Sequence, residues 1–232
     1  IYKKKQDDIH FFSDEEIIKI KNNIEKGYYK SYKHHLSEKT ITHGPYFVSQ
    51  AKIFLFLINI GLRCGESVAL KYSDINFEKS TMTVDRASIG YKERNRDGSE
   101  TGKFVTDLSS PKTSSSKTTI KISPYAIQIL KEMLREEPEG YQGFILHDEH
   151  HRQISSNALG KRFSNLLAGA GVSKCGTHSL RHTCATQMYK QSSYNIKFVA
   201  NQIRHKDAAF TANTYIHNDE AENDKILKVF KV

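Results

Sequence analysis

The stretch 175–217 carries residues whose types and spacing could do chemistry. His178 and Arg181 lie three residues apart in it, a spacing that places an imidazole and a guanidinium on one face of a helix. A second helical segment is expected to end at His205, and Tyr215 follows ten residues later. One tyrosine, two histidines and one arginine on short helices, in a basic chain, suit chemistry on a phosphodiester.

A DNA phosphodiester has no neighbouring 2′-hydroxyl, so its cleavage needs an outside nucleophile, either a metal-activated water or a side chain. The acidic residues are scattered over expected helix faces and loops, without a paired-carboxylate motif beside the basic residues. Tyr215 is therefore the candidate nucleophile, although a phenol of pKa about 10 needs help at neutral pH. Arg63 and Arg181 could bind the charged transition state, and His178 and His205 could exchange protons. A hairpin lysine could protonate the leaving 5′-oxygen.

The composition agrees with a polyanionic partner. The 232 residues suffice for a sizeable core, and 35 Lys and Arg outnumber 26 Asp and Glu, for a net charge of +9. This balance favours nucleic acid or an anionic membrane surface, while a basic protein with neither partner stays open. No signal peptide is visible, and the longest apolar run, from Ile53, is far shorter than a membrane span.

Three cysteines without a CxxC pair indicate reduced thiols in an intracellular protein: Cys64, Cys175 and Cys184. Two groups of residues could be taken for zinc ligands. The run HDEHH at 147–151 lacks the HExxH spacing, because its glutamate directly precedes a histidine. The second group, whose spacing matches no closed Cys/His site, is Cys175, His178, His182 and Cys184. A structural zinc is therefore disfavoured.

Helical patterning dominates the chain, with a capping box at Ser13 and Glu16 and a proline, Pro124, at a first turn. Helices are expected at 13–27, 45–61, 124–138, 155–171 and 218–230. Two further helices are expected, one that starts after the N-cap Thr177 and one that ends at His205. Arg63 lies on the turn after the second helix, and Glu66 begins a further short helix. The polar, aromatic segment 28–44 is expected to be a loop or a frayed helix.

Between residues 73 and 123 the pattern changes to short alternating runs that are typical of strands. A hairpin is expected at 73–87 and two short strands at 104–123, separated by a polar, mobile excursion at 89–103. The sequence therefore predicts an α+β class, mainly α-helical, with a small antiparallel β-sheet of three or four strands packed on helices.

Four motifs follow one another in the chain: GLRCGES, SSPKTSSSKTTIKIS, THSLRHTCAT and IRHKDAAFTANTYIH. In this order they resemble the catalytic domain of the tyrosine recombinases, the phage and transposon integrases, over about residues 12–217. The resemblance implies the tyrosine recombinase catalytic fold. It also implies a site-specific DNA recombinase that cleaves and rejoins DNA through a 3′-phosphotyrosine intermediate, without metal, ATP or another cofactor, for a mobile genetic element.

The family's functional residues fall on matching positions of this chain. The resemblance implies that the catalytic residues are Arg63, Lys112, His178, Arg181, His205 and the nucleophile Tyr215, with Glu66 in support. Lys117 is the alternative to Lys112 as the hairpin acid. Where the family has Leu-Gly-His, this chain has Ile-Arg-His, and Arg204 is expected to add positive charge near the phosphate.

The resemblance also implies a domain organisation and partners. Residues 1–12 are expected to be a linker from an upstream core-binding domain, 13–218 the catalytic domain, and 219–232 a C-terminal helix exchanged between subunits. The expected partners are double-stranded DNA at element ends or attachment sites, three further copies in a homo-tetramer, and accessory DNA-bending or excision factors, but no membrane. The expected place is the bacterial cytoplasm, on the nucleoid. A type IB topoisomerase-like enzyme and a non-catalytic DNA-binding module are the alternatives.

Overall fold

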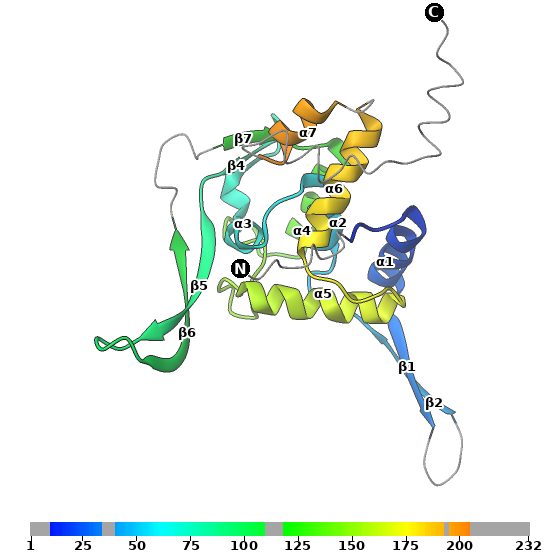
Figure 1. Cartoon of the computed structure of the whole chain (residues 1–232). Coiled ribbons are helices and arrows are strands. Elements are labelled where there is room, and N and C mark those ends of the chain that lie inside the picture. The colour runs from blue at the N-terminus through cyan, green and yellow to red at the C-terminus, as the bar shows by residue number, and fades with distance from the viewer. Residues whose placement is uncertain (1–9, 34–39, 110–117, 193–194, 205–232) are drawn as a thin grey trace, which may run out of the picture.

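A computed structural model of the chain shows a mainly helical body from which two β-hairpins project (Figure 1). It describes residues 10–33, 40–109, 118–192 and 195–204. The helices are α1 (Asp14–Lys26), α2 (Lys52–Ile60), α3 (Cys64–Ala69), α4 (Pro124–Leu134), α5 (Ser156–Ala170), α6 (His178–Gln191) and α7 (Ile196–Gln202). The strands are β1 (Tyr28–Lys33), β2 (Thr40–Tyr46), β3 (Ile75–Asn76), β4 (Thr81–Val84), β5 (Ala87–Arg94), β6 (Glu100–Ser109) and β7 (Thr118–Lys121). The α+β class is as the sequence predicts.

Helix α2 forms the centre of the core. Seven of its nine residues are buried, and it packs against α4 and α6. Its apolar run correctly predicts a buried helix that stops at Gly61, but the helix begins at Lys52 and not near Pro45. The reason is that Pro45 lies in β2, whose extended backbone is paired with β1.

Strands β1 and β2 form a hairpin, so the prediction of a loop or frayed helix at 28–44 is wrong. They pair antiparallel, with Tyr28 opposite Tyr46. The rings of these tyrosines lie 5.7 Å apart, and the Lys30 ammonium lies 5.8 and 5.5 Å from their centroids. Cross-strand aromatic and cation–π contacts stabilise this pair, although the segment is too polar to show apolar alternation.

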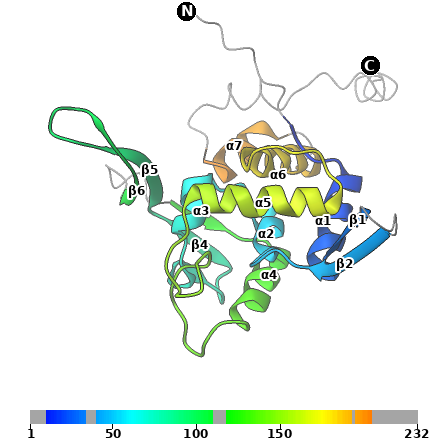
Figure 2. The ribbon, with the colours of Figure 1, turned by 90° about the horizontal axis from the view of Figure 1, so that it is seen from below.

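Strands β3, β4 and β7 form the small antiparallel sheet that the sequence predicts. Met82 on β4 pairs with Ile120 on β7, and both side chains belong to the same core as α2. Strands β5 and β6 form a separate long hairpin that includes most of 89–103, so this polar segment is paired strand and not the mobile excursion that the sequence predicts. Charged cross-strand pairs such as Lys92 and Glu100, 2.7 Å apart, replace apolar alternation in it. Both hairpins point away from the helical body (Figure 2).

Local signals place several helix ends correctly. Ser13 Oγ accepts a hydrogen bond from the Glu16 backbone N–H at 3.2 Å, and Glu16 Oε2 accepts one from the Ser13 N–H at 3.0 Å. This completes the predicted capping box of α1. Pro124 occupies the first turn of α4, and Gly171 ends α5 in the left-handed region.

Helix α6 begins at His178, with Thr177 at the N-cap position but without a side-chain cap bond. The buried hydroxyl of Thr183 accepts a hydrogen bond from the Phe12 backbone N–H at 2.9 Å, which ties α6 to the segment before α1. None of the helices in the described part of the chain is both long and apolar enough to cross a membrane.

The end of α2 approaches α6 so closely that position 61 requires glycine. Gly61 has φ of 68°, and a Cβ there would lie 3.1 Å from Cys184 Sγ and 3.3 Å from Ile203 Cγ2. We expect Gly61→Ala to lower the free energy of unfolding by about 1–3 kcal/mol, through backbone strain and overpacking. Gly160→Ala in α5, where a Cβ meets nothing within 4 Å, is the control and should raise it by about 0.5–1 kcal/mol. Urea denaturation measures both, and a neutral Gly61→Ala would contradict the requirement.

Candidate active site

Arg181, on the first turn of α6, is buried, with 1% of its surface exposed. Its Nη1 donates to the carbonyl oxygen of Gly61 and its Nη2 to that of Ile203, each at 2.6 Å. A buried guanidinium needs oxygen partners for its N–H donors, and these carbonyls lie at the ends of α2 and α7. The positive charge is therefore fixed between three helices.

Arg63 lies at the N-cap of α3, with an extended backbone, on the turn that follows α2. Glu66 accepts hydrogen bonds from its backbone N–H at 2.8 Å and from Nη1 at 3.0 Å. Arg63 Nη2 also donates to the carbonyl oxygen of Arg204 at 3.1 Å. The side chain of Arg63 remains 45% exposed, so its guanidinium is oriented yet open to a ligand.

Arg204 shares the carboxylate of Glu66, because its Nη2 donates to Glu66 Oε2. Its side chain is 11% exposed, and within the described part of the chain its Nη1 has no hydrogen-bond partner. Its φ is 56°, in the region that glycine adopts freely. The sequence indicates only added positive charge here. The structure shows instead that this charge lies against Glu66, which joins two arginines.

His178 is the first residue of α6, and its ring lies 4.9 Å from that of His182, edge to face. Burial lowers its pKa from the ordinary 6.5, and the positive charges of Arg181 and Arg63 lower it further. The imidazole is therefore neutral at pH 7 and can accept a proton. The pKa of His178 is lower in the folded chain than in the unfolded chain. The contribution of His178 to the free energy of unfolding is therefore present above pH 6.5 and is lost as the pH falls through the folded pKa.

The structure thus brings together four of the predicted site residues, from the turn after α2, from α3 and from α6: Arg63, Glu66, His178 and Arg181. The other predicted positions lie outside the described residues: Lys112, Lys117, His205 and Tyr215. Helix α7 ends at Gln202, earlier than the expected end at His205. Two oriented guanidinium groups can bind a phosphate ester, and a neutral imidazole can accept the proton of a nucleophile that attacks it. Arg181 must be uncovered before it can touch one.

The group of cysteines and histidines around α6 does not form a metal site among the described residues. Cys175 Sγ lies 3.1 Å from Ser179 Oγ. Cys184 is buried, and burial raises its pKa to about 12 against the opposing charge of Arg181. Partial burial also raises the pKa of Cys175, so both thiols are protonated at neutral pH, as expected of reduced cysteines that pack in or against the core.

The shared carboxylate predicts an unequal response to two substitutions. We expect Glu66→Gln to lower the free energy of unfolding by about 2–4 kcal/mol, because it leaves the buried Arg204 without a counter-charge. Arg204→Gly should cost less, since glycine tolerates φ of 56° and Glu66 keeps Arg63. Urea denaturation of the two variants and of the double variant measures the coupling. Additive losses in the double variant would show that the two side chains do not depend on each other.

Comparison with known proteins places these features in a family. The sequence model of the phage integrase family matches residues 34–222. A XerC-like tyrosine recombinase of Caldanaerobacter subterraneus subsp. tengcongensis is 30% identical over 226 residues, which are 92% of this chain and 52% of that protein. The transposase of transposon Tn916 from Enterococcus faecalis is 28% identical over 177 residues, 70% of this chain and 41% of that protein. The chain thus spans about half the length of these relatives or less.

The fold agrees with this assignment. The integrase of transposon Tn1549, solved in complex with a circular intermediate DNA, superposes with a TM-score of 0.70 at 15% identity, covering 99% of this chain and 69% of that one. XerA recombinase superposes with a TM-score of 0.61 at 16% identity, covering 96% and 66%. The chain has the fold of the tyrosine recombinases, and it belongs to the phage integrase family.

Proposed function

We propose that this chain is the catalytic part of a site-specific DNA recombinase of a mobile genetic element. The observation that carries the proposal is the convergence of Arg63, His178 and Arg181 from separate parts of the chain, with Glu66 orienting the exposed guanidinium. The net charge of +9 suits the DNA backbone. Similarity to integrases and transposases of phages and transposons supports DNA ends or attachment sites as the substrate.

The proposed reaction is a phosphoryl transfer to a protein oxygen. The phenol oxygen of Tyr215 attacks the phosphorus, its proton passes to a histidine (His178 or His205), and a 3′-phosphotyrosine bond forms. The bond from phosphorus to the 5′-oxygen breaks, and Lys112 gives that oxygen its proton. Arg63, and Arg181 once it is uncovered, bind the non-bridging oxygens, on which negative charge develops. Attack by the 5′-hydroxyl of another strand reverses the step and restores the tyrosine, so that no ATP is needed.

The proposed assembly extends beyond the described residues. Residues 1–12 would link the catalytic domain, 13–218, to an upstream core-binding domain, and 219–232 would pack on a neighbouring subunit of a DNA-bound tetramer. The full protein would act on the nucleoid in the bacterial cytoplasm, with accessory DNA-bending or excision factors.

Covalent capture on DNA tests the nucleophile. On a nicked duplex that carries an element end, cleavage releases a short strand. Because the 5′-hydroxyl of that strand is then no longer present to reverse the step, the protein stays covalently attached to the DNA. We expect a covalent band in EDTA that disappears in Tyr215→Phe and persists in the control Tyr125→Phe, an exposed tyrosine of α4. DNA binding should remain in all three proteins, as measured by gel shift.

A band that survives Tyr215→Phe would move the nucleophile elsewhere and contradict the site. Loss of the band in EDTA would favour a metal-dependent nuclease. Binding without a band on any element end, also in a protein that includes the proposed upstream domain, would favour a non-catalytic DNA-binding module. Relaxation of supercoiled DNA without exchange of strands between two duplexes would favour a topoisomerase.

Substitution of the leaving oxygen by sulfur tests the hairpin acid. A 5′-thiolate, of pKa near 8.5 for a thiol, leaves without a proton donor, whereas an alkoxide does not. We expect Lys112→Ala to slow cleavage of ordinary DNA by about 10²- to 10⁴-fold and to regain most of the rate on DNA with a bridging 5′-sulfur. Lys117→Ala is the matched control and should be close to wild type on both. The reverse pattern would assign the role to Lys117.

A further inference from the structure

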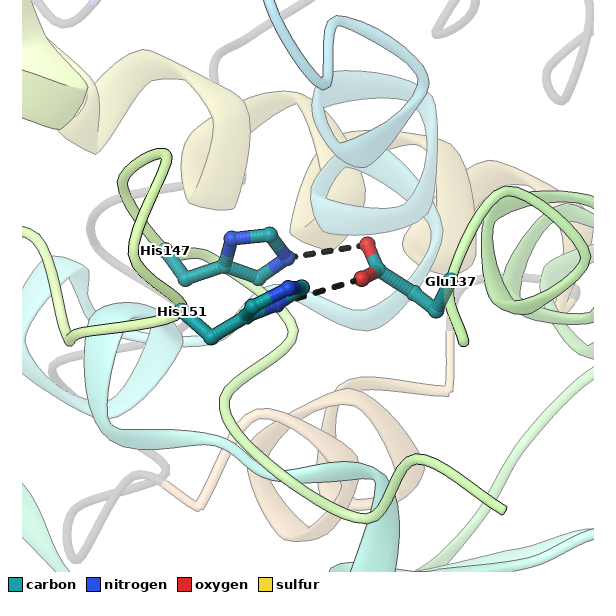
Figure 3. A group of neighbouring side chains, drawn as sticks. All are labelled: Glu137, His147 and His151. Carbon is teal, nitrogen blue, oxygen red and sulfur yellow. Dashed lines mark hydrogen bonds and ion pairs between the residues drawn. The ribbon is translucent and has the colours of Figure 1, made fainter. Parts of the chain in front are cut away.

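Three potential metal ligands converge on the loop between α4 and α5. Glu137 lies just beyond the end of α4, and His147 and His151 lie further along the loop, with all three side chains pointing toward one another (Figure 3). Glu137 Oε1 lies 2.9 Å from His147 Nε2, and Glu137 Oε2 lies 3.5 Å from His151 Nδ1. One ligand atom from each residue lies within 4.8 Å of the other two.

The hydrogen bonds of His147 fix which ring nitrogen faces the glutamate. His147 Nδ1 lies 2.7 Å from the carbonyl oxygen of Asp148, and a carbonyl can only accept, so Nδ1 carries the hydrogen. Nε2 therefore faces the carboxylate of Glu137 at 2.9 Å, where one cation could contact both atoms. A backbone bond to the distal nitrogen is also the usual arrangement of a metal-binding histidine.

We propose that Glu137, His147 and His151 bind a zinc ion or a similar divalent transition metal. Ligand atoms about 2.1 Å from a tetrahedral zinc lie about 3.4 Å apart. The separations of 2.9 and 3.5 Å are near this value, but each involves a different oxygen of Glu137, so a small shift of the side chains is needed for a single oxygen to bind the ion with both imidazoles. Imidazole nitrogens with one carboxylate oxygen suit zinc better than magnesium or calcium, which prefer oxygen ligands alone. Since His151 is 44% exposed, water can supply the fourth ligand.

The surrounding bonds hold the ligands in place. Asp148 Oδ1 accepts from the backbone N–H groups of His150 and Arg152, at 2.9 and 3.0 Å, which closes the loop tightly. His151 has φ of 56°, a conformation that this loop stabilises and that directs its ring to the cluster. Arg162 donates to the carbonyl oxygen of His147 at 3.0 Å and fixes its backbone.

Burial makes a cation favourable at this place, although the charge of Arg162 on the backbone side opposes it. The side chains of Glu137 and His147 are only 9% and 11% exposed, and a buried carboxylate needs a positive partner. Tyr72 is buried nearby, but its hydroxyl has no hydrogen-bond partner within the described residues, so it does not donate to the carboxylate of Glu137. The Tyr141 ring packs 5.7 and 5.0 Å from the two histidine rings and shields the cluster.

The proposed metal lies at the opposite end of α2 from the candidate active site. Gln50, just before α2, accepts from the His147 backbone N–H at 3.3 Å, whereas Arg63 follows the other end of this helix. A helix of nine residues rises about 13 Å. The metal would therefore stabilise the α4–α5 loop and take no part in strand cleavage, so the site is independent of the proposed function.

The neighbouring residues offer matched controls. We would remove metal from the wild-type chain with EDTA, dialyse it, and measure zinc binding by calorimetry and metal analysis without DNA. The test variants are Glu137→Gln and His151→Gln, and the controls are their neighbours Glu136→Gln and His150→Gln, whose side chains are 68% and 64% exposed. Far-ultraviolet circular dichroism establishes that each variant is folded.

We expect the wild-type chain to bind one zinc ion. At a free zinc concentration a hundredfold above Kd, the Tm should rise by about 5 °C, and magnesium should cause no comparable rise in Tm. Zinc affinity should fall at least about tenfold in both test variants and stay unchanged in both controls. No binding by the wild type, or binding that survives in the test variants, would overturn the proposal; the first result would leave the cluster as side chains that contact one another without a metal. Covalent capture by Tyr215 in EDTA is a separate readout, so failure of one proposal is not failure of the other.

Discussion

The buried guanidinium of Arg181 is the interaction on which the candidate active site depends. Moving a cation out of water costs several kcal/mol unless its donors find oxygens. Here the oxygens are the carbonyls of Gly61 and Ile203, at the C-terminal ends of α2 and α7, where carbonyls lack helical partners and carry partial negative charge. Satisfying this one side chain therefore brings three helix ends together, and a bulky residue at position 61 would separate them.

The second layer of the site is a carboxylate shared by two arginines. Glu66 orients Arg63, which is open to solvent, and neutralises Arg204, which is not. Arg204 adopts a backbone conformation that costs a non-glycine residue about 1 kcal/mol, so its ion pair must compensate for that strain. The arrangement keeps one guanidinium available for a phosphate while the other supports the turn just before His205.

Local signals made much of the helical structure predictable. A capping box at Ser13, a first-turn proline at Pro124 and an apolar run before Gly61 each act within a few residues. The sequence does not predict the two hairpins, because their stability comes from cross-strand partners. Tyr28 and Tyr46, or Lys92 and Glu100, show no pattern that the chain reveals before the strands meet.

The same distinction between local and distant contacts explains the two polar clusters. The spacing of His178 and Arg181 predicts their common helix face, because a helix fixes it. The pairing of Glu66 with Arg204 joins residues 138 positions apart, and no spacing rule reaches that far. The run at 147–151 supplies two histidines, but the carboxylate between them is Glu137 and not Glu149, whose side chain is 87% exposed. A motif search on that run fails because the third ligand comes from outside it, and only the folded loop puts the three residues together.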